Sequence, residues 1–207
     1  FEPMLSPQRM PGPETIQTIV AQKVYKISQD TLIYDFGQNM AGWARLRIGG
    51  QQDRTIQLRY AERIDSTGRL DSLSLRSAKA KDVFIQKKGT FIDYEPLFTY
   101  HGFRFVEISG LGIGTDSLEL KAQVVHNKLD KKSDFRCSSP ILNRIYSMIK
   151  WSLKSNYQQV PVDCPQREER LGWLGDRTAS VYGEAYMYDI YQFYKKWLQD
   201  IKDAQAE

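Results

Sequence analysis

The hydrophobic pattern of the chain changes near Asn127, and this change limits the folds that the chain can adopt. From about residue 24 to residue 126, short segments alternate apolar and polar residues. In "WARLRIGG", Ala44, Leu46 and Ile48 face one way and the intervening arginines face the other. Glycines and polar turns separate such segments, which is typical of antiparallel strands. Beyond Asn127 the apolar residues recur at helical spacing, as in Ile141, Ile145, Ile149 and Leu153. The chain is therefore predicted to form strands first and helices afterwards.

The same pattern divides the chain into three parts. Residues 1–22 contain four prolines and are interpreted as a linker or the tail of a preceding domain. Residues 23–129 predict an antiparallel β-sandwich domain. Residues 130–207 predict helices, with Ser139 and Pro140 placed to begin the first and Asp176 placed to cap a later one. The chain has no initial methionine and ends within a helical pattern, so we expect a piece of a longer protein.

Composition excludes several classes of function. The 29 basic and 25 acidic side chains are spread along the 207 residues, so no basic stripe indicates a nucleic-acid partner. No apolar run approaches the roughly 20 residues that cross a bilayer, so no membrane segment is expected. Cys137 and Cys164 are interpreted as buried thiols, and no histidine or cysteine stands at metal-ligand spacing. We expect no cofactor and no transition metal, while calcium held by carboxylates stays open.

The segment "DCPQREERLGWLGD", residues 163–176, concentrates charge beside turn-forming residues. It contains four carboxylates and two arginines around Trp173. Pro161 and Pro165 oppose a helix at its start, and Gly172 and Gly175 weaken one at its end. The segment is therefore predicted to be a loop between helices rather than a solvated helix face.

Such a loop can aim several carboxylates into one cavity, where close like charges raise the proton affinity of one of them. A protonated carboxyl group can act as a general acid, and an indole offers a flat apolar surface for a sugar ring. Paired carboxylates with aromatic walls are what glycoside hydrolysis requires. A structural network of ion pairs between helices is the competing interpretation.

Four stretches in order make a more specific pattern: "YDFGQNMAGW" at 34–43, "AERIDSTGRL" at 61–70, "PLFTYHGFRFVEISG" at 96–110 and the charged segment at 163–176. With them, the chain from about Val24 onwards resembles the bacterial α-L-rhamnosidases. The resemblance implies an inverting glycosidase in which β-sandwich domains precede an (α/α)6 catalytic barrel. This chain then holds one antiparallel β-sandwich and the first helices of the barrel.

The resemblance also implies roles for individual residues. The second glutamate of the pair, Glu169, corresponds to the general acid, and the residues that hold the sugar correspond to Asp163, Arg167, Trp173 and Asp176. Glu168 receives no role. The general base corresponds to a glutamate later in the barrel, outside this chain, so the chain alone is expected to be inactive. The implied partner is a rhamnose-containing glycoside or polysaccharide, while compartment and oligomeric state are not predicted.

Two other functions stay open. One is a non-catalytic carbohydrate-binding or structural module, and the other is an inverting glycosidase for a different sugar. Outside the charged segment the residues have structural interpretations: Trp43 as core, His101 as a packed, hydrogen-bonded histidine, and Glu184 as an exposed or ion-paired helix residue. Asp35, Gln38 and Asn39 are predicted to form a tight turn. The tyrosines wall a cleft or pack between helices: Tyr182, Tyr186, Tyr188, Tyr191 and Tyr194.

Overall fold

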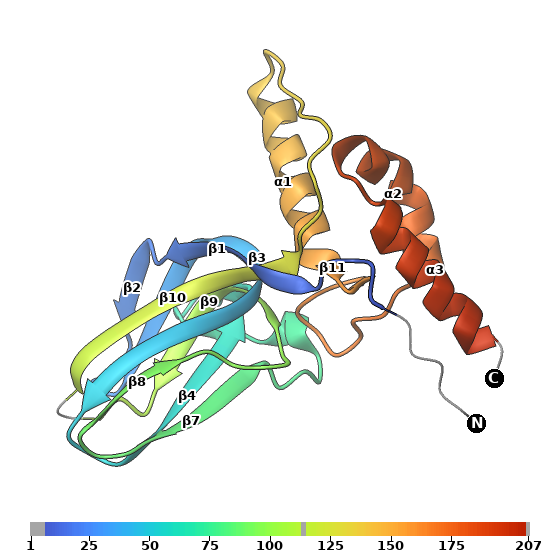
Figure 1. Ribbon diagram of the computed structural model, residues 1–207. Coiled ribbons are helices and arrows are strands. Elements are labelled where there is room, and N and C mark those ends of the chain that lie inside the picture. The colour runs from blue at the N-terminus through green and yellow to red at the C-terminus, as the bar shows by residue number, and fades with distance from the viewer. Residues whose placement is uncertain (1–6, 113–114, 206–207) are drawn as a thin grey trace, which may run out of the picture. The chain divides into compact units, whose positions relative to one another are not determined.

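The computed structural model describes residues 7–112 and 115–205 (Figure 1), which fall into two compact units. The first, here called the β unit, comprises Thr15–Val125 together with Cys164–Arg170. The second, the helical unit, comprises the described residues up to Glu14, His126–Asp163 and the described residues from Leu171 onwards. The predicted order of antiparallel strands followed by helices is confirmed.

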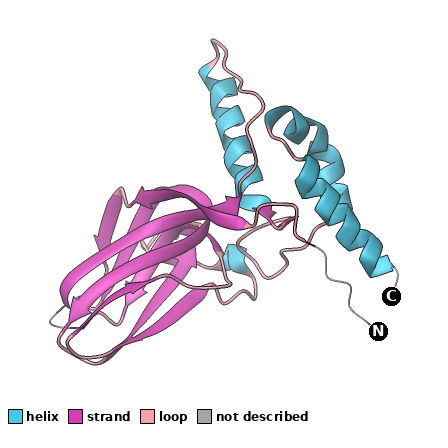
Figure 2. Cartoon of the chain, in the orientation of Figure 1, coloured by secondary structure: helices cyan, strands magenta, loops and turns pink. Residues whose placement is uncertain are grey.

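The β unit is built on one sheet in which eight strands are hydrogen-bonded (Figure 2). The main order is β1-β10-β3-β9-β4-β7, and β2 and β8 also pair with β3. The strands of this sheet are β1 (Pro13–Val20), β2 (Lys23–Lys26), β3 (Thr31–Gly50), β4 (Arg54–Ala61), β7 (Lys81–Gln86), β8 (Thr90–Tyr94), β9 (His101–Ser109) and β10 (Thr115–Asn127). A separate pair, β5 (Arg63–Ile64) and β6 (Leu70–Asp71), and a 3-10 turn, η1 (Leu73–Leu75), precede β7. Residues 13–20, which lie in the expected linker, thus form a strand of the sheet.

Strand β3 makes the sheet curl into a half-barrel, because its two halves have different partners. Its first half pairs with β2 and β9, and its second half pairs with β10 and β8. Gly42 lies where these pairings meet, and a Cβ atom there would stand 1.8 Å from the Gln123 carbonyl oxygen. Only glycine allows β10 to approach this closely. The alternation predicted for β3 is confirmed, since Ala44, Leu46 and Ile48 are all fully buried.

The predicted tight turn at residues 35–39 is instead an irregularity within β3, where the register against β9 shifts between Asp35 and Met40. The Asp35 carboxylate accepts the Gly37 N–H at 2.7 Å and both nitrogens of the Arg104 fork at 2.7 and 2.8 Å. Hydrogen bonds from Arg104 lower the pKa of the buried Asp35 carboxyl. The Asp35 carboxylate therefore stabilises the irregularity in β3, and its hydrogen bonds are made within the protein rather than to a ligand.

The helical unit contains α1 (Pro140–Asn156), α2 (Leu174–Met187), α3 (Tyr191–Gln205) and a short pair, β11 (Tyr157–Gln158) and β12 (Val160–Pro161). Ser139 caps α1 as predicted, but the N-cap of α2 is Trp173, and Asp176 lies in the first turn instead. The predicted apolar face of α1 is largely exposed among the described residues, since only Leu153 is buried. The core gathers residues from all three helices, from their connections and, through Met10, from the segment before β1: Met10, Leu153, Tyr157, Met187, Tyr188, Ile190 and Phe193.

Tyr188 gives this core a sensitivity to alkaline pH. Its side chain is buried, and desolvation raises its pKa to about 12 from the ordinary 10.0. The folded state therefore keeps a proton that the unfolded chain loses above pH 10. The resulting contribution to stability is fully present below pH 10 and disappears as the pH rises to about 12, at a cost of about 2–3 kcal/mol.

Tyr188→Phe should remove this pH-dependent contribution to the free energy of unfolding, because phenylalanine carries no ionisable hydroxyl. Urea unfolding at pH 9 and pH 12 should show the wild-type protein losing about 2–3 kcal/mol more than the variant. The other buried tyrosines titrate equally in both proteins and cancel. Equal losses in the two proteins contradict the prediction.

Candidate active site

The predicted charged loop begins and ends in the helical unit. The Asp163 N–H donates to the Leu171 carbonyl at 3.0 Å, and the Leu171 N–H donates to Asp163 Oδ1 at 2.8 Å. Next to this clasp, Gly172 packs on Trp197, whose indole nitrogen lies 2.7 Å from the position that a Cβ would take. Asp163 therefore holds the two ends of the loop together, and a side chain at Gly172 would displace Trp197.

Between these ends, residues 164–170 belong to the β unit and contain no helix, as predicted. Gly102 on β9 contacts the loop through its backbone, because a Cβ there would lie 2.8 Å from the Gln166 nitrogen. The Arg170 guanidinium lies over the Tyr100 ring, 4.4 Å from its centroid. Contacts from "TYHGF" at the start of β9 thus position the loop.

Glu169 is half-buried within this loop and is held by two arginines. Its Oε2 lies 2.8 Å from Arg167 Nη2 and 3.5 Å from Arg76 Nη1. About a quarter of the Glu169 side chain, 26%, is exposed. Arg167 also lies 2.9 Å, through Nε, from the sulfur of Cys164. The structure therefore brings two of the predicted site residues, Arg167 and Glu169, into direct contact.

The other three predicted site residues lie in the helical unit. Asp163 is half-buried in the clasp, Trp173 is 48% exposed, and Asp176 is exposed in the first turn of α2. A carboxylate in that turn stabilises the helix through its dipole. The five residues are thus divided between the two units, and their predicted roles toward a sugar stay predictions.

A hollow of about 340 Å³ adjoins the loop in the β unit. Arg167, Glu168 and Arg170 line it from the loop. Lys81 of β7 and His101 of β9 line it from the sheet, and Lys79 lines it from the segment before β7. His101 is buried and stacks on Tyr60, as expected for a packed histidine, and its Nε2 lies 3.1 Å from Asp82 Oδ1. Glu168 and Arg170, the sequence neighbours of the predicted general acid, therefore line a polar hollow, and Glu169 itself is not part of the lining.

Glu184 was predicted to be exposed or ion-paired, and the ion-paired alternative is confirmed by its 3.2 Å contact with Arg177. Sequence reasoning missed its burial, since Glu184 is only 1% exposed. Ser180 donates to it at 2.6 Å, Tyr194 at 2.7 Å and Tyr157 at 3.1 Å. Arg177, Ser180 and Glu184 are spaced to share one face of α2, which is the signal that could have revealed the network.

Burial and the Glu184 carboxylate both raise the pKa values of Tyr157 and Tyr194. Both tyrosines therefore keep their hydroxyl protons and serve as donors to the carboxylate. Arg177 also donates to the Val162 carbonyl, immediately before the clasp residue Asp163. The Glu184 network thus connects α2, α3 and the start of the charged loop.

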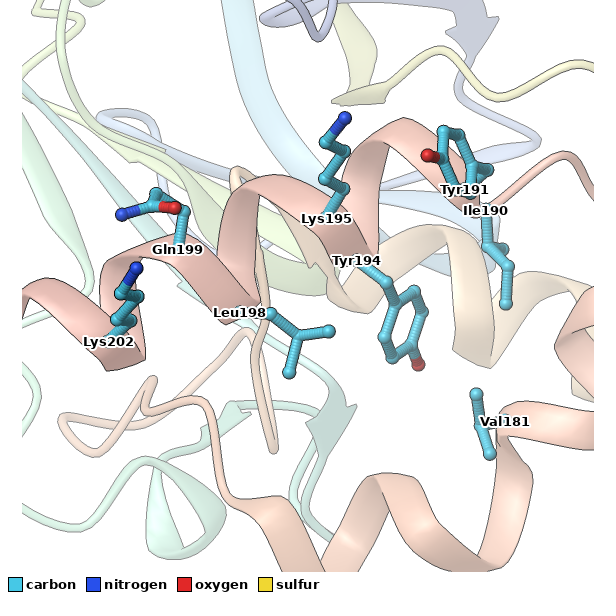
Figure 3. Close-up of a pocket in the computed structure, with 8 residues that line it drawn as sticks. All are labelled: Val181, Ile190, Tyr191, Tyr194, Lys195, Leu198, Gln199 and Lys202. Carbon is cyan, nitrogen blue, oxygen red and sulfur yellow. The ribbon is translucent and has the colours of Figure 1, made fainter.

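A second hollow, of about 620 Å³, lies between α2 and α3 and is lined mainly by apolar groups (Figure 3). Tyr194 and Leu198 point from α3 toward Val181 of α2, whereas Lys195 points to the opposite side of α3. The lining carries no carboxylate. Of the predicted cleft tyrosines, Tyr188 is buried and Tyr194 half-buried, while three are largely exposed: Tyr182, Tyr186 and Tyr191.

The remaining candidates have structural environments. Trp43, expected in the core, is half-buried and donates its indole N–H to Glu95 at 2.8 Å. Cys137 and Cys164 form no disulfide and are half-buried rather than buried. Within residues 7–112 and 115–205, no group of three or more His, Cys, Asp or Glu side chains could hold a metal ion. Over the same ranges, no helix has the length and apolar character needed to cross a membrane.

Two family models match the chain in succession. Residues 25–126 match the bacterial alpha-L-rhamnosidase concanavalin-like domain, and residues 130–207 match the bacterial alpha-L-rhamnosidase 6 hairpin glycosidase domain. The second match contains the whole charged segment.

Curated relatives and solved structures agree with these matches. An alpha-L-rhamnosidase of Alteromonas sp. (strain LOR) is 36% identical over 206 residues, which are 99% of this chain and 22% of the relative. The alpha-L-rhamnosidase structure from Dictyoglumus thermophilum is 38% identical with a TM-score of 0.90, over 96% of this chain and 22% of that one. The structure of the Streptomyces avermitilis alpha-L-rhamnosidase complexed with L-rhamnose is 36% identical with a TM-score of 0.88, over 96% of this chain and 19% of that one. The chain spans about a fifth of the length of these relatives. By both family models and by these relatives, it belongs to the bacterial α-L-rhamnosidase family.

Proposed function

We propose that this chain is part of a glycoside hydrolase that removes terminal α-L-rhamnosyl residues with inversion of the anomeric configuration. The observation that carries the proposal is the match of residues 130–207 to the glycosidase domain of the family, because that match contains the charged segment. The relatives named alpha-L-rhamnosidases, at 36–37% identity over almost the whole chain, support the same substrate class.

In this proposal Glu169 is the general acid. Its proton passes to the glycosidic oxygen while the bond between that oxygen and the anomeric carbon breaks with its electron pair. A water molecule attacks the anomeric carbon from the opposite face, and a carboxylate base takes the proton of that water. The base belongs to a part of the enzyme outside these residues. The 2.8 Å contact with Arg167 supports a fixed position for the Glu169 carboxyl group.

The residues proposed to hold the sugar are Asp163, Arg167, Trp173 and Asp176. Their types suit a pyranose, since carboxylates and a guanidinium bond to hydroxyl groups and an indole covers an apolar ring face. Asp163 stands at the start of the loop, and Trp173 and Asp176 stand at the start of α2. The clasp and the packing of Gly172 on Trp197 restrain the backbone there.

Proton NMR of the full-length protein acting on an aryl α-L-rhamnoside tests the reaction. The first product should be β-L-rhamnose, because single displacement inverts the anomeric centre. A panel of other aryl glycosides serves as the control for the sugar. Initial release of α-L-rhamnose contradicts inversion, and faster turnover of another glycoside contradicts the sugar assignment.

A further inference from the structure

Arg76 stands in a backbone conformation that residues with a side chain rarely adopt. Its φ of 51° and ψ of −118° match the first central position of a type II′ turn. The Ala78 N–H donates to the Leu75 carbonyl at 3.0 Å, which closes this turn. Glycine dominates the position, because a Cβ atom is strained there. An arginine in such a turn costs conformational free energy, and strain of this kind is concentrated at functional sites.

The turn is held in place within the β unit. Before it, Leu75 is buried at the end of η1. After it, Ala80 is buried, and its carbonyl accepts the Tyr60 N–H of β4 at 3.0 Å. Residues 78–81, which follow the turn, line the same hollow as the charged loop. The turn is therefore anchored beside that loop.

The Arg76 side chain reaches from this turn to Glu169. Arg76 Nη1 lies 3.5 Å from Glu169 Oε2, the same oxygen that lies 2.8 Å from Arg167 Nη2. Guanidinium nitrogens only donate, so both arginines require Oε2 to act as an acceptor. A carboxyl group with its proton on Oε1 meets this requirement, since its Oε2 then carries no hydrogen. The two arginines together therefore favour the acid proton on Oε1.

We infer that Arg76 is a positioning residue for the proposed general acid. With Arg167 it holds Oε2, directs the proton to Oε1 and stabilises the carboxylate that remains after proton transfer. The inference rests on the proposed function of Glu169. In that step the Oε1–H bond breaks, the proton joins the glycosidic oxygen, and the electron pair of the bond stays on the carboxylate. Negative charge that develops beside two fixed guanidinium groups is stabilised, which lowers the barrier.

Arg76→Met in the full-length enzyme tests the inference, because it removes the charge. On a rhamnosyl disaccharide kcat should fall about fivefold, the upper end of what a partly exposed ion pair contributes, while KM changes less than about twofold. On an activated dinitrophenyl rhamnoside, which needs little proton donation, kcat should change less than about twofold. Arg47→Met is the matched control and should keep wild-type kinetics, since Arg47 Nη1 lies 3.5 Å from Glu119 Oε2 on β10.

Arg76→Gly separates the side chain from the turn. Glycine suits the type II′ position, so hydrogen exchange at the Ala78 amide should be at least as slow as in the wild-type protein. The loss of kcat on the disaccharide should nevertheless equal that of Arg76→Met. A role confined to the fold predicts the opposite, because the glycine variant keeps the turn.

The outcomes separate the role of Arg76 from that of Glu169. A loss of the same size on both substrates, a similar loss in Arg47→Met, wild-type kinetics in Arg76→Gly or faster exchange at its Ala78 amide overturns the inference. If Glu169→Gln is inactive on the disaccharide while Arg76→Met is unimpaired, the general-acid assignment stands and only the role of Arg76 is rejected. If Glu169→Gln hydrolyses the disaccharide at the wild-type rate, the proposed function of Glu169 fails first.

Discussion

Glu169→Gln in the full-length enzyme should lower kcat/KM by roughly 10²–10⁴-fold on a rhamnoside whose leaving group is a sugar or an alcohol. Such a leaving group departs as a strongly basic oxygen, so the transition state depends on proton donation. Glutamine preserves the size of the side chain and can still meet Arg167, but it has no acidic proton to transfer. Steady-state kinetics on a rhamnosyl disaccharide measures the loss.

Two comparisons distinguish a lost acid from a disturbed fold. With an activated dinitrophenyl rhamnoside the leaving group needs little protonation, so the variant should lose far less activity. Glu119→Gln is the matched control, because Glu119 is also an ion-paired glutamate of the β unit but lies on β10, away from the loop. Equal losses on both substrates, or a similar loss in the control, contradict the assignment of Glu169 as the acid.

The largest expected effect on stability comes from Glu184. Glu184→Leu leaves the guanidinium of Arg177, only 7% exposed, without its carboxylate partner. Breaking a buried pair in this way typically costs about 3–5 kcal/mol, because a buried charge is left uncompensated. Ser180, Tyr157 and Tyr194 lose their acceptor at the same time. Hydrogen exchange at the α2 amides of the full-length protein should report this loss as a lower free energy of opening.

A double variant identifies the cause. Arg177→Met combined with Glu184→Leu removes both charges and should recover much of the loss, since apolar replacements of a buried pair are often neutral. Asp200→Asn is the surface control: it breaks the partly exposed Lys196–Asp200 pair on α3 and should cost at most about 0.5 kcal/mol. A double variant as unstable as Glu184→Leu alone contradicts the explanation by uncompensated charge.

Much of the fold was predictable because local periodicity reports which face of an element is buried. The alternation around Leu46 gave a strand, and Ser139 followed by Pro140 gave the start of α1. The prolines and glycines of residues 161–175 predicted a loop, which is right only as far as Trp173, because α2 begins at Leu174 and contains Gly175. Asp176 was wrongly predicted as the cap of α2, since a cap depends on the path of the preceding chain, and the clasp of Asp163 with Leu171 makes Trp173 the N-cap.

The sequence by itself determined the order of strands and helices, the position of the charged loop and, through four motifs in order, the family. These properties depend on neighbouring residues or on residue identity alone. Only the tertiary structure decided that Glu169 is held by Arg76, that Glu184 is buried in a hydrogen-bonded network, and that Lys79 and His101 line one hollow with Arg170. Such contacts join residues from distant segments or depend on packing between elements. Burial and electrostatic environment arise from that packing, and no local pattern encodes them.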